Sequence, residues 1–171
     1  FAIPVVFVKS NDVTLLKNDQ QVVIETDIEK IMHSGHNVIG YIDNHAENII
    51  VIGAHYDHLG YGGHESLYRG ERAIHNGADD NASGTSALIE LARKLKGSSL
   101  NKYNYMFIAF SGEEKGLLGS NYFVKHPTIK KKKVNYMLNM DMVGRLKPTD
   151  HVLLINGAGT SPSWDSLLNN I

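Results

Sequence analysis

The sequence predicts an α/β fold, in which helices flank a mixed and largely parallel central sheet. Nearly continuous apolar runs are typical of strands buried on both faces, and two such runs occur, Asn48–Ala54 and Tyr105–Phe110, while Val134–Met140 is predicted to form a third strand. The clearest helical pattern, Ser83–Leu95, lies between the first two runs. Strands that alternate with helices along a chain favour a sheet with helices on both faces.

The segment before these runs predicts further strands and a hairpin. Ile3–Val8 is a short apolar run that ends at a turn-prone Ser-Asn-Asp sequence. Gln21–Thr26 and Asn37–Ile42 have the composition of strands, and the Ser34-Gly35 turn between them predicts that they pair.

Leu59–His75 is rich in glycine, histidine and polar residues and predicts a long loop. Long loops in compact domains are often functional.

The helix over Ser83–Leu95 is predicted from an apolar stripe at helical spacing. The stripe consists of Ala87, Leu88, Leu91, Ala92 and Leu95. In the later part of the chain, a short helix is predicted at Leu117–Lys125 and a solvated lysine turn at Lys130–Lys133. A fourth strand is predicted at Val152–Ile155 and a last helix at Ser163–Asn170.

The composition excludes several classes of protein. The 171 residues include 17 Lys and Arg against 18 Asp and Glu, and a formal charge of −1 argues against a dedicated nucleic-acid or membrane-surface binder. No apolar run is long enough to predict a membrane span. Because the chain has no cysteine, it has no disulfide, no thiolate metal ligand and no cysteine nucleophile.

Acidic residues and a histidine follow the ends of the three predicted apolar strands. His55 follows the first strand, the Glu113-Glu114 pair follows the second, and Asp141 follows the third. A further acidic cluster, Asp79-Asp80-Asn81, stands just before the predicted helix. Because the carboxyl ends of parallel strands meet at one edge of a sheet, we expect these side chains to come together there.

The chemistry of this set points to a metal site. One imidazole and several carboxylates, with no thiolate, suit Zn²⁺ or another divalent ion, and a carboxylate can bridge two metals. Asp57 lies two residues after His55 and is placed to hold the far ring nitrogen of that ligand. The side chains of Glu113 and Glu114 are expected to point apart, so that one binds metal and the other accepts a proton.

Taken singly, these residues have ordinary structural explanations. Asp and Asn before a helix often cap its N-terminus, and a lone His or a Glu-Glu pair is usually a surface feature. Their recurrence at successive strand ends is what favours a metal site. His58, His64 and His75 lie in or near the predicted loop and are further candidates for lining the site.

Four motifs, in this order, resemble those of the M28 family of zinc aminopeptidases. They are GAHYDH at 53–58, GADDNASG at 77–84, EEKGLLGS at 113–120 and NMDMVG at 139–144, within a match that spans roughly residues 36–165. The resemblance implies a zinc-exopeptidase-like fold and hydrolysis of the first peptide bond of peptides that have a free N-terminus. It also implies a secreted or periplasmic protein.

The resemblance implies a role for each candidate residue. Two zinc ions would be held by His55 and Asp141 on one side, Glu114 on the other, and Asp80 as the bridge between them. Glu113 would act as general base and acid, and Asp57 would orient His55. In this family the peptide bond after the bridging Asp is often cis, so Asp80–Asn81 is the expected position of such a bond.

One ligand of the family pattern has no clear counterpart. The family's final His ligand lies well after the position of Asp141, and the only later histidine here is His151. The resemblance therefore implies that residues 19–171 form the N-terminal part of a catalytic domain, and that this part alone binds zinc incompletely and is inactive. Residues 1–18 would hold the tail of a protease-associated domain.

Three other functions remain open at this point. A glutaminyl cyclase, a relative with one zinc, would cyclise N-terminal Gln, but the Asp79-Asp80-Asn81 and Asn139–Met142 motifs favour the two-zinc peptidase. A non-catalytic binding homologue would have lost ligands, whereas every ligand position within the match is intact. A metal phosphatase or nuclease would need a basic phosphate-binding segment near the motifs, and Lys130–Lys133 stands away from them in sequence.

Overall fold

The computed structural model describes residues 7–9, 11, 23, 25, 27, 29–63, 66–149 and 152–169. The chain divides into two compact units, Phe1–His33 and Ser34–Ile171, and all the elements described below belong to the second. Several sequence predictions fall wholly or largely outside the described residues: the strands Ile3–Val8 and Gln21–Thr26, and the candidates His64 and His151.

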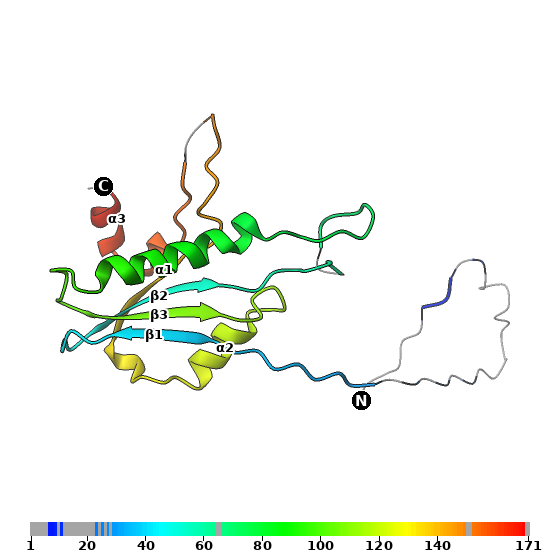
Figure 1. The fold of residues 1–171 in the computed structure, drawn as a ribbon, viewed down its shortest axis with the longest axis horizontal. Coiled ribbons are helices and arrows are strands. Elements are labelled where there is room, and N and C mark those ends of the chain that lie inside the picture. The colour runs from blue at the N-terminus through cyan, green and yellow to red at the C-terminus, as the bar shows by residue number, and fades with distance from the viewer. Residues whose placement is uncertain are drawn as a thin grey trace. The chain divides into compact units, whose positions relative to one another are not determined.

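A four-stranded mixed sheet is the centre of this unit, with the strand order β1-β3-β2-β4 (Figure 1). Its strands are β1 (Val38–Ile42), β2 (Ile49–His55), β3 (Asn104–Phe110) and β4 (Val134–Asn139). Strand β2 pairs in parallel with both β3 and β4, whereas β1 runs antiparallel to β3. The predicted mixed and largely parallel sheet is therefore confirmed.

Helices cover both faces of the sheet, as the alternation of strands and helices predicted. An irregular helical turn, η2 (Ala78–Ser83), leads into α1 (Gly84–Leu95), and α2 (Leu118–Lys125) follows β3. The short turns η3 (Lys131–Lys133) and η4 (Ala158–Thr160) and the helix α3 (Ser163–Leu168) complete the described elements. Among the described residues, no helix combines the length and apolar character that a membrane crossing requires.

Alternate side chains of the central strands explain why their sequences are continuously apolar. One set, including Ile52 and Phe107, packs with Leu88 of α1 on one face. The other set, including Ile108, packs on the opposite face with Phe123 of α2. All residues of β2 are buried, as expected for a strand covered on both sides. Because β2 lies between β3 and β4, its end stands between the ends of its two parallel neighbours.

The predicted strand Val152–Ile155 is wrong. These residues form no strand, and their exposures run from 53% for Leu153 to 77% for Leu154. A strand needs a neighbour whose backbone groups pair with its own, and an apolar run does not supply one. Within the described part of the chain, β4 pairs with β2 only and forms one edge of the sheet.

Candidate metal centre

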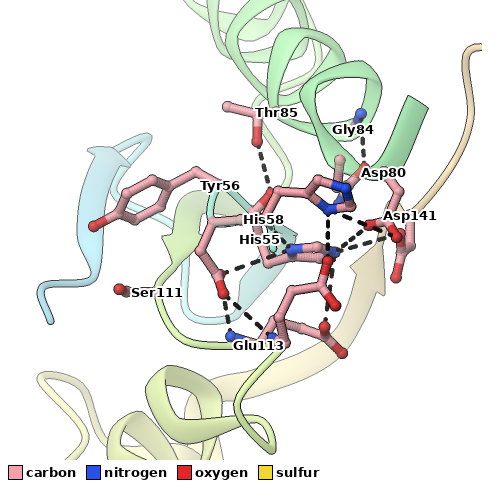
Figure 2. Close-up of polar contacts among 12 residues, drawn as sticks. His55, Tyr56, His58, Asp80, Gly84, Thr85, Ser111, Glu113 and Asp141 are labelled. Carbon is pink, nitrogen blue, oxygen red and sulfur yellow. Dashed lines mark hydrogen bonds and ion pairs between the residues drawn. The ribbon is translucent and has the colours of Figure 1, made fainter. Parts of the chain in front are cut away.

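His55 ends β2 and is the centre of a cluster of carboxylates. Its side chain is 2% exposed, and its Nε2 lies 3.2 Å from Asp80 Oδ1, 3.5 Å from Asp141 Oδ1 and 3.9 Å from Glu113 Oε2 (Figure 2). Glu113 follows β3 and Asp141 follows β4, the two parallel neighbours of β2. The parallel register therefore gathers at one edge the side chains that follow three strands, as the sequence predicted.

Asp80 reaches this cluster from η2, where the backbone leaves helical geometry at Asp80 and Asn81. The peptide bond between these residues is cis, which confirms the expectation from the resemblance. The buried Asn81 side chain ties the turn to the segment after β4. Its Nδ2 donates to the carbonyl of Met140 at 3.0 Å, and its Oδ1 accepts from the backbone N–H of Gly84 at 3.0 Å and of Met142 at 3.3 Å. Asn81 thereby holds Asp80 beside the segment that carries Asp141.

Two positioning contacts of this kind were not predicted from the sequence. One is Asn81, although it stands inside the acidic motif and its type suits local hydrogen bonding to the backbone. The other is Thr85, whose Oγ1 donates to the carbonyl of His55 at 2.8 Å and so joins α1 to the end of β2. Nothing in the sequence distinguishes Thr85, in the first turn of a helix, from a threonine that makes no such contact.

Asp57 holds the loop after β3 against the end of β2. Its Oδ1 accepts from the backbone N–H of Glu113 at 3.1 Å, and its Oδ2 accepts from that of Glu114 at 3.2 Å. His55 Nδ1 lies 3.1 Å from the Asp57 carbonyl oxygen and 3.7 Å from its carboxylate. Asp57 is therefore placed beside the far nitrogen of His55, as expected, but its carbonyl oxygen is the nearer group.

Glu114 points away from Glu113 toward a second histidine, His58. The Nδ1 atom of His58 lies 2.6 Å from Glu114 Oε1 and 4.0 Å from Asp80 Oδ2. Two groups of ligand atoms result, His55 with Asp80 and Asp141, and His58 with Asp80 and Glu114; within each group the atoms lie within 4.8 Å of one another. Asp80 belongs to both groups, which is the arrangement that a bridging carboxylate requires.

The electrostatics of the cluster suit a bound cation. Burial raises the pKa of Glu113, and the nearby carboxylates of Asp141 and Glu114 raise it further. Burial opposes the charged form of His55, but the carboxylates around it, led by Asp141, raise its pKa above the ordinary value of 6.5. The neighbouring carboxylates contribute to both shifts, as expected where negative charge accumulates. Each of the two ligand groups consists of one imidazole nitrogen and two carboxylate oxygens, a donor set that fits a divalent metal.

A small cavity of about 110 Å³ opens beside His55 and Glu113. Its walls include Phe110, Leu117, Ser120 and Asn139. The site therefore has an acidic side, toward the cluster, and a partly apolar side, toward the loop after β3.

Comparison with known proteins agrees with this geometry. Peptidase family M28 matches residues 37–170. The aminopeptidase YwaD of Bacillus subtilis (strain 168) is 40% identical over 100 residues, which are 57% of this chain and 18% of that protein.

Solved structures with similar folds include a Zn-dependent exopeptidase and a glutaminyl cyclase. A Zn-dependent exopeptidase from Parabacteroides distasonis is 27% identical, with a TM-score of 0.55, over 63% of this chain and 41% of that one. A glutaminyl cyclase from Bacteroides thetaiotaomicron, solved with N-acetylhistamine, is 26% identical, with a TM-score of 0.54, over 63% and 41% of the two chains. The chain thus spans less than half the length of these relatives. The family match covers most of the 171 residues, so the chain belongs to peptidase family M28.

Proposed function

We propose that this protein hydrolyses the N-terminal peptide bond of peptides with a metal site that holds two zinc ions. The observation that carries the proposal is the pair of ligand groups that share Asp80. The Zn-dependent exopeptidase and the aminopeptidase among the similar proteins support both the metal and the substrate class. One ion would be held by His55 and Asp141 and the other by Glu114, with Asp80 between them.

Glu113 acts as the general base and then as the general acid in this reaction. Bound zinc supplies Lewis-acid polarisation of the carbonyl and lowers the pKa of a water molecule. The Glu113 carboxylate, 3.9 Å from His55 Nε2 and open to the small cavity, accepts the proton of the attacking water and returns it to the leaving amine. Its raised pKa favours this second step, because a larger fraction of the carboxyl group is then protonated near neutral pH and available to donate.

The neighbouring residues keep Glu113 in place. The backbone N–H groups of Glu113 and Glu114 both donate to Asp57, so the two side chains leave a fixed loop in different directions. Glu113 is directed toward His55 and Glu114 toward His58. This divergence separates the proton-transfer group from the metal ligand that is adjacent in sequence.

The test is Glu113→Gln in the natural polypeptide that contains these residues. Glutamine keeps the shape of the side chain but cannot accept the proton, so the variant should retain its zinc content and lose about 10²-fold or more in release of amino acids from aminoacyl anilides. Glu90→Gln, at an exposed position of α1 beside Arg93, is the matched control and should keep full turnover. Full activity of Glu113→Gln would show that Glu113 is not the base.

Glutaminyl cyclisation is a second candidate, because glutaminyl cyclases are among the proteins of similar fold. Two ligand groups that share one carboxylate favour the two-metal hydrolase over an enzyme with one zinc. Incubation of the same polypeptide with a peptide that begins with glutamine separates the two activities. Loss of ammonia indicates cyclisation, and release of free glutamine indicates hydrolysis.

A further inference from the structure

The segment that follows β4 is held by side chains from another part of the chain. The N–H group of Met140 still donates to the Gly53 carbonyl of β2, at 2.9 Å. The N–H groups of the three successive residues 142–144 donate instead to side chains of the motif before α1. The acceptors are, in order, Asn81 Oδ1 at 3.3 Å, Ser83 Oγ at 3.0 Å and Asp79 Oδ1 at 2.9 Å. Asp141 therefore stands between the last of these sheet contacts and the first contact with the three side chains, which we call the clasp.

Helix capping, the ordinary explanation for acidic and hydroxyl residues before a helix, does not account for the outer two members of the clasp. Ser83 is the residue at the N-terminal boundary of α1, but its side chain makes no capping hydrogen bond. Its hydroxyl donates to the Asp79 carbonyl at 2.7 Å and accepts from the Val143 N–H. The Asp79 carboxylate accepts from Gly144, which lies 65 residues later in the chain. Both side chains thus make long-range contacts with the segment that carries Asp141.

The two segments approach each other closely because residue 144 is a glycine. A Cβ atom at Gly144 would lie 2.7 Å from Ser83 Cβ and 3.2 Å from Asp79 Oδ1. Met142, two residues earlier, has a φ of 55°, a left-handed conformation that a residue with a side chain adopts only where its surroundings hold it. The hydrogen bonds of the clasp supply that restraint on both sides of Val143. The path of the backbone just after Asp141 therefore depends on the clasp.

We propose that Asp79 and Ser83 are positioning residues for the metal ligand Asp141, through their hydrogen bonds to the N–H groups of Gly144 and Val143. The Asp141 side chain is 44% exposed, so packing alone leaves it several rotamers, and a fixed backbone limits where its carboxylate can lie. Its Oδ1 then stays within reach of a metal ion held by His55. The inference rests on the proposed role of Asp141 as a zinc ligand, and it adds two residues to which the family resemblance gives no role.

The test compares the zinc affinities of Asp79→Ala and Asp79→Asn in the natural polypeptide that contains these residues, by competition with a chromophoric chelator. Each affinity is measured where far-UV circular dichroism shows the variant to be folded, so a loss of stability alone does not lower it. Asp79→Ala removes the acceptor and should weaken the site that contains Asp141 by about 10–100-fold. Asp79→Asn keeps an oxygen acceptor in a side chain of the same shape and should restore the affinity of the unchanged protein.

Asp43→Ala is the matched control. The Asp43 carboxylate also accepts a backbone N–H, from His45 at 2.8 Å, but its side chain is exposed. Asp43 follows β1, whose last residue pairs with Tyr105 near the start of β3, so it lies at the edge of the sheet opposite the metal cluster. This variant should bind zinc with the affinities of the unchanged protein.

The outcomes separate this inference from the proposed function. Unchanged zinc affinity in Asp79→Ala overturns the inference and leaves the two-zinc function standing. Equal weakening in Asp79→Ala and Asp79→Asn would mean that the charge beside Asp80, and not the bond to Gly144, sets the affinity, and would also overturn the inference. A single zinc equivalent in the unchanged protein, weakened by Asp79→Ala and restored by Asp79→Asn, supports the inference but contradicts the two-zinc function.

A second variant decides if Asp79→Ala does not fold. Ser83→Ala removes only a hydroxyl group, and with it the acceptor of the Val143 N–H. It should weaken the site that contains Asp141 by more than about tenfold. If the folded Ser83→Ala variant bound zinc as tightly as the unchanged protein, the clasp would not position Asp141 and the inference would be overturned.

Discussion

Replacement of Asp57 by Asn tests how the loop after β3 is held at the metal cluster. The Asp57 carboxylate accepts one backbone N–H on each oxygen, from Glu113 at 3.1 Å and from Glu114 at 3.2 Å. An amide has one acceptor oxygen, so Asp57→Asn leaves one of these N–H groups facing an NH₂ group. It also removes the negative charge 3.7 Å from His55 Nδ1.

The expected magnitude follows from these contacts. A hydrogen bond to a charged group contributes about 1.5–3 kcal/mol, and an orphaned buried donor costs about 1–3 kcal/mol. The two quantities overlap, and Asp57 is 21% exposed, so water replaces part of the loss. We therefore expect Asp57→Asn to lower the free energy of unfolding of the metal-free protein by about 2 kcal/mol. Its effect through His55 and the glutamates should weaken zinc binding by about 10–100-fold.

Urea unfolding of the metal-free protein and zinc competition with a chromophoric chelator measure the two effects. Asp43→Asn is the control, because Asp43 is 59% exposed and its Oδ1 accepts only a local N–H, from His45. It should change the free energy of unfolding by less than about 0.5 kcal/mol and leave zinc affinity unchanged. If Asp57→Asn matched this control in both measurements, the carboxylate would not hold the loop and the argument would be refuted.

Three further predictions concern the turn, the core and the charge state. Gly84→Ala should destabilise the protein by about 1–3 kcal/mol in urea unfolding, because its Cβ would overlap the Asn81 side chain and the Met140 carbonyl oxygen; equal stability would contradict this. Leu88→Ala, at a buried position of α1, should cost about 2–5 kcal/mol by the same assay without changing zinc stoichiometry. Because zinc binds neutral imidazole and the pKa of His55 is raised above 6.5, calorimetric zinc affinity should fall as the pH decreases, with a midpoint above 6.5; a midpoint below that value would count against the raised pKa.

The buried part of the fold was predictable because residues that are covered on both faces of a sheet must be apolar. Strands β2 and β3 are covered on both faces, so their sequences show continuous apolar runs that end where the sheet edge meets polar groups. The predicted strand ends in turn located His55, Glu113 and Asp141 from the sequence alone. Helix α1 was equally clear, because one of its faces packs on the sheet and the other meets water.

Pairing between distant segments was not predictable in the same way. An apolar run such as Val152–Ile155 satisfies the composition of a strand, but strand formation depends on a partner elsewhere in the chain. Strand β1 pairs with β3, more than sixty residues away, and no local turn signals that contact. Such pairings depend on which other strands still have unpaired backbone N–H and C=O groups, and a single sequence does not reveal this.

Within the site, residue types were predicted better than their contacts. Asp57 was expected to hold the far nitrogen of His55, and it does lie beside that nitrogen, with its backbone carbonyl oxygen as the nearer group. Its carboxylate accepts from the backbone N–H groups of Glu113 and Glu114, a contact that was not predicted. The contact between His58 and Glu114 depends on how the loop folds over Gly77, and the spacing of histidines in the sequence gives no indication of it.

Anomalous diffraction at the zinc edge, from crystals of the zinc-loaded protein, tests the two-metal centre most directly. Two peaks are expected, about 3.5–4 Å apart, on either side of the Asp80 carboxylate. One should lie next to His55 and Asp141, and the other next to His58 and Glu114. A single peak at His55, with none beside Glu114, would contradict the two-metal centre.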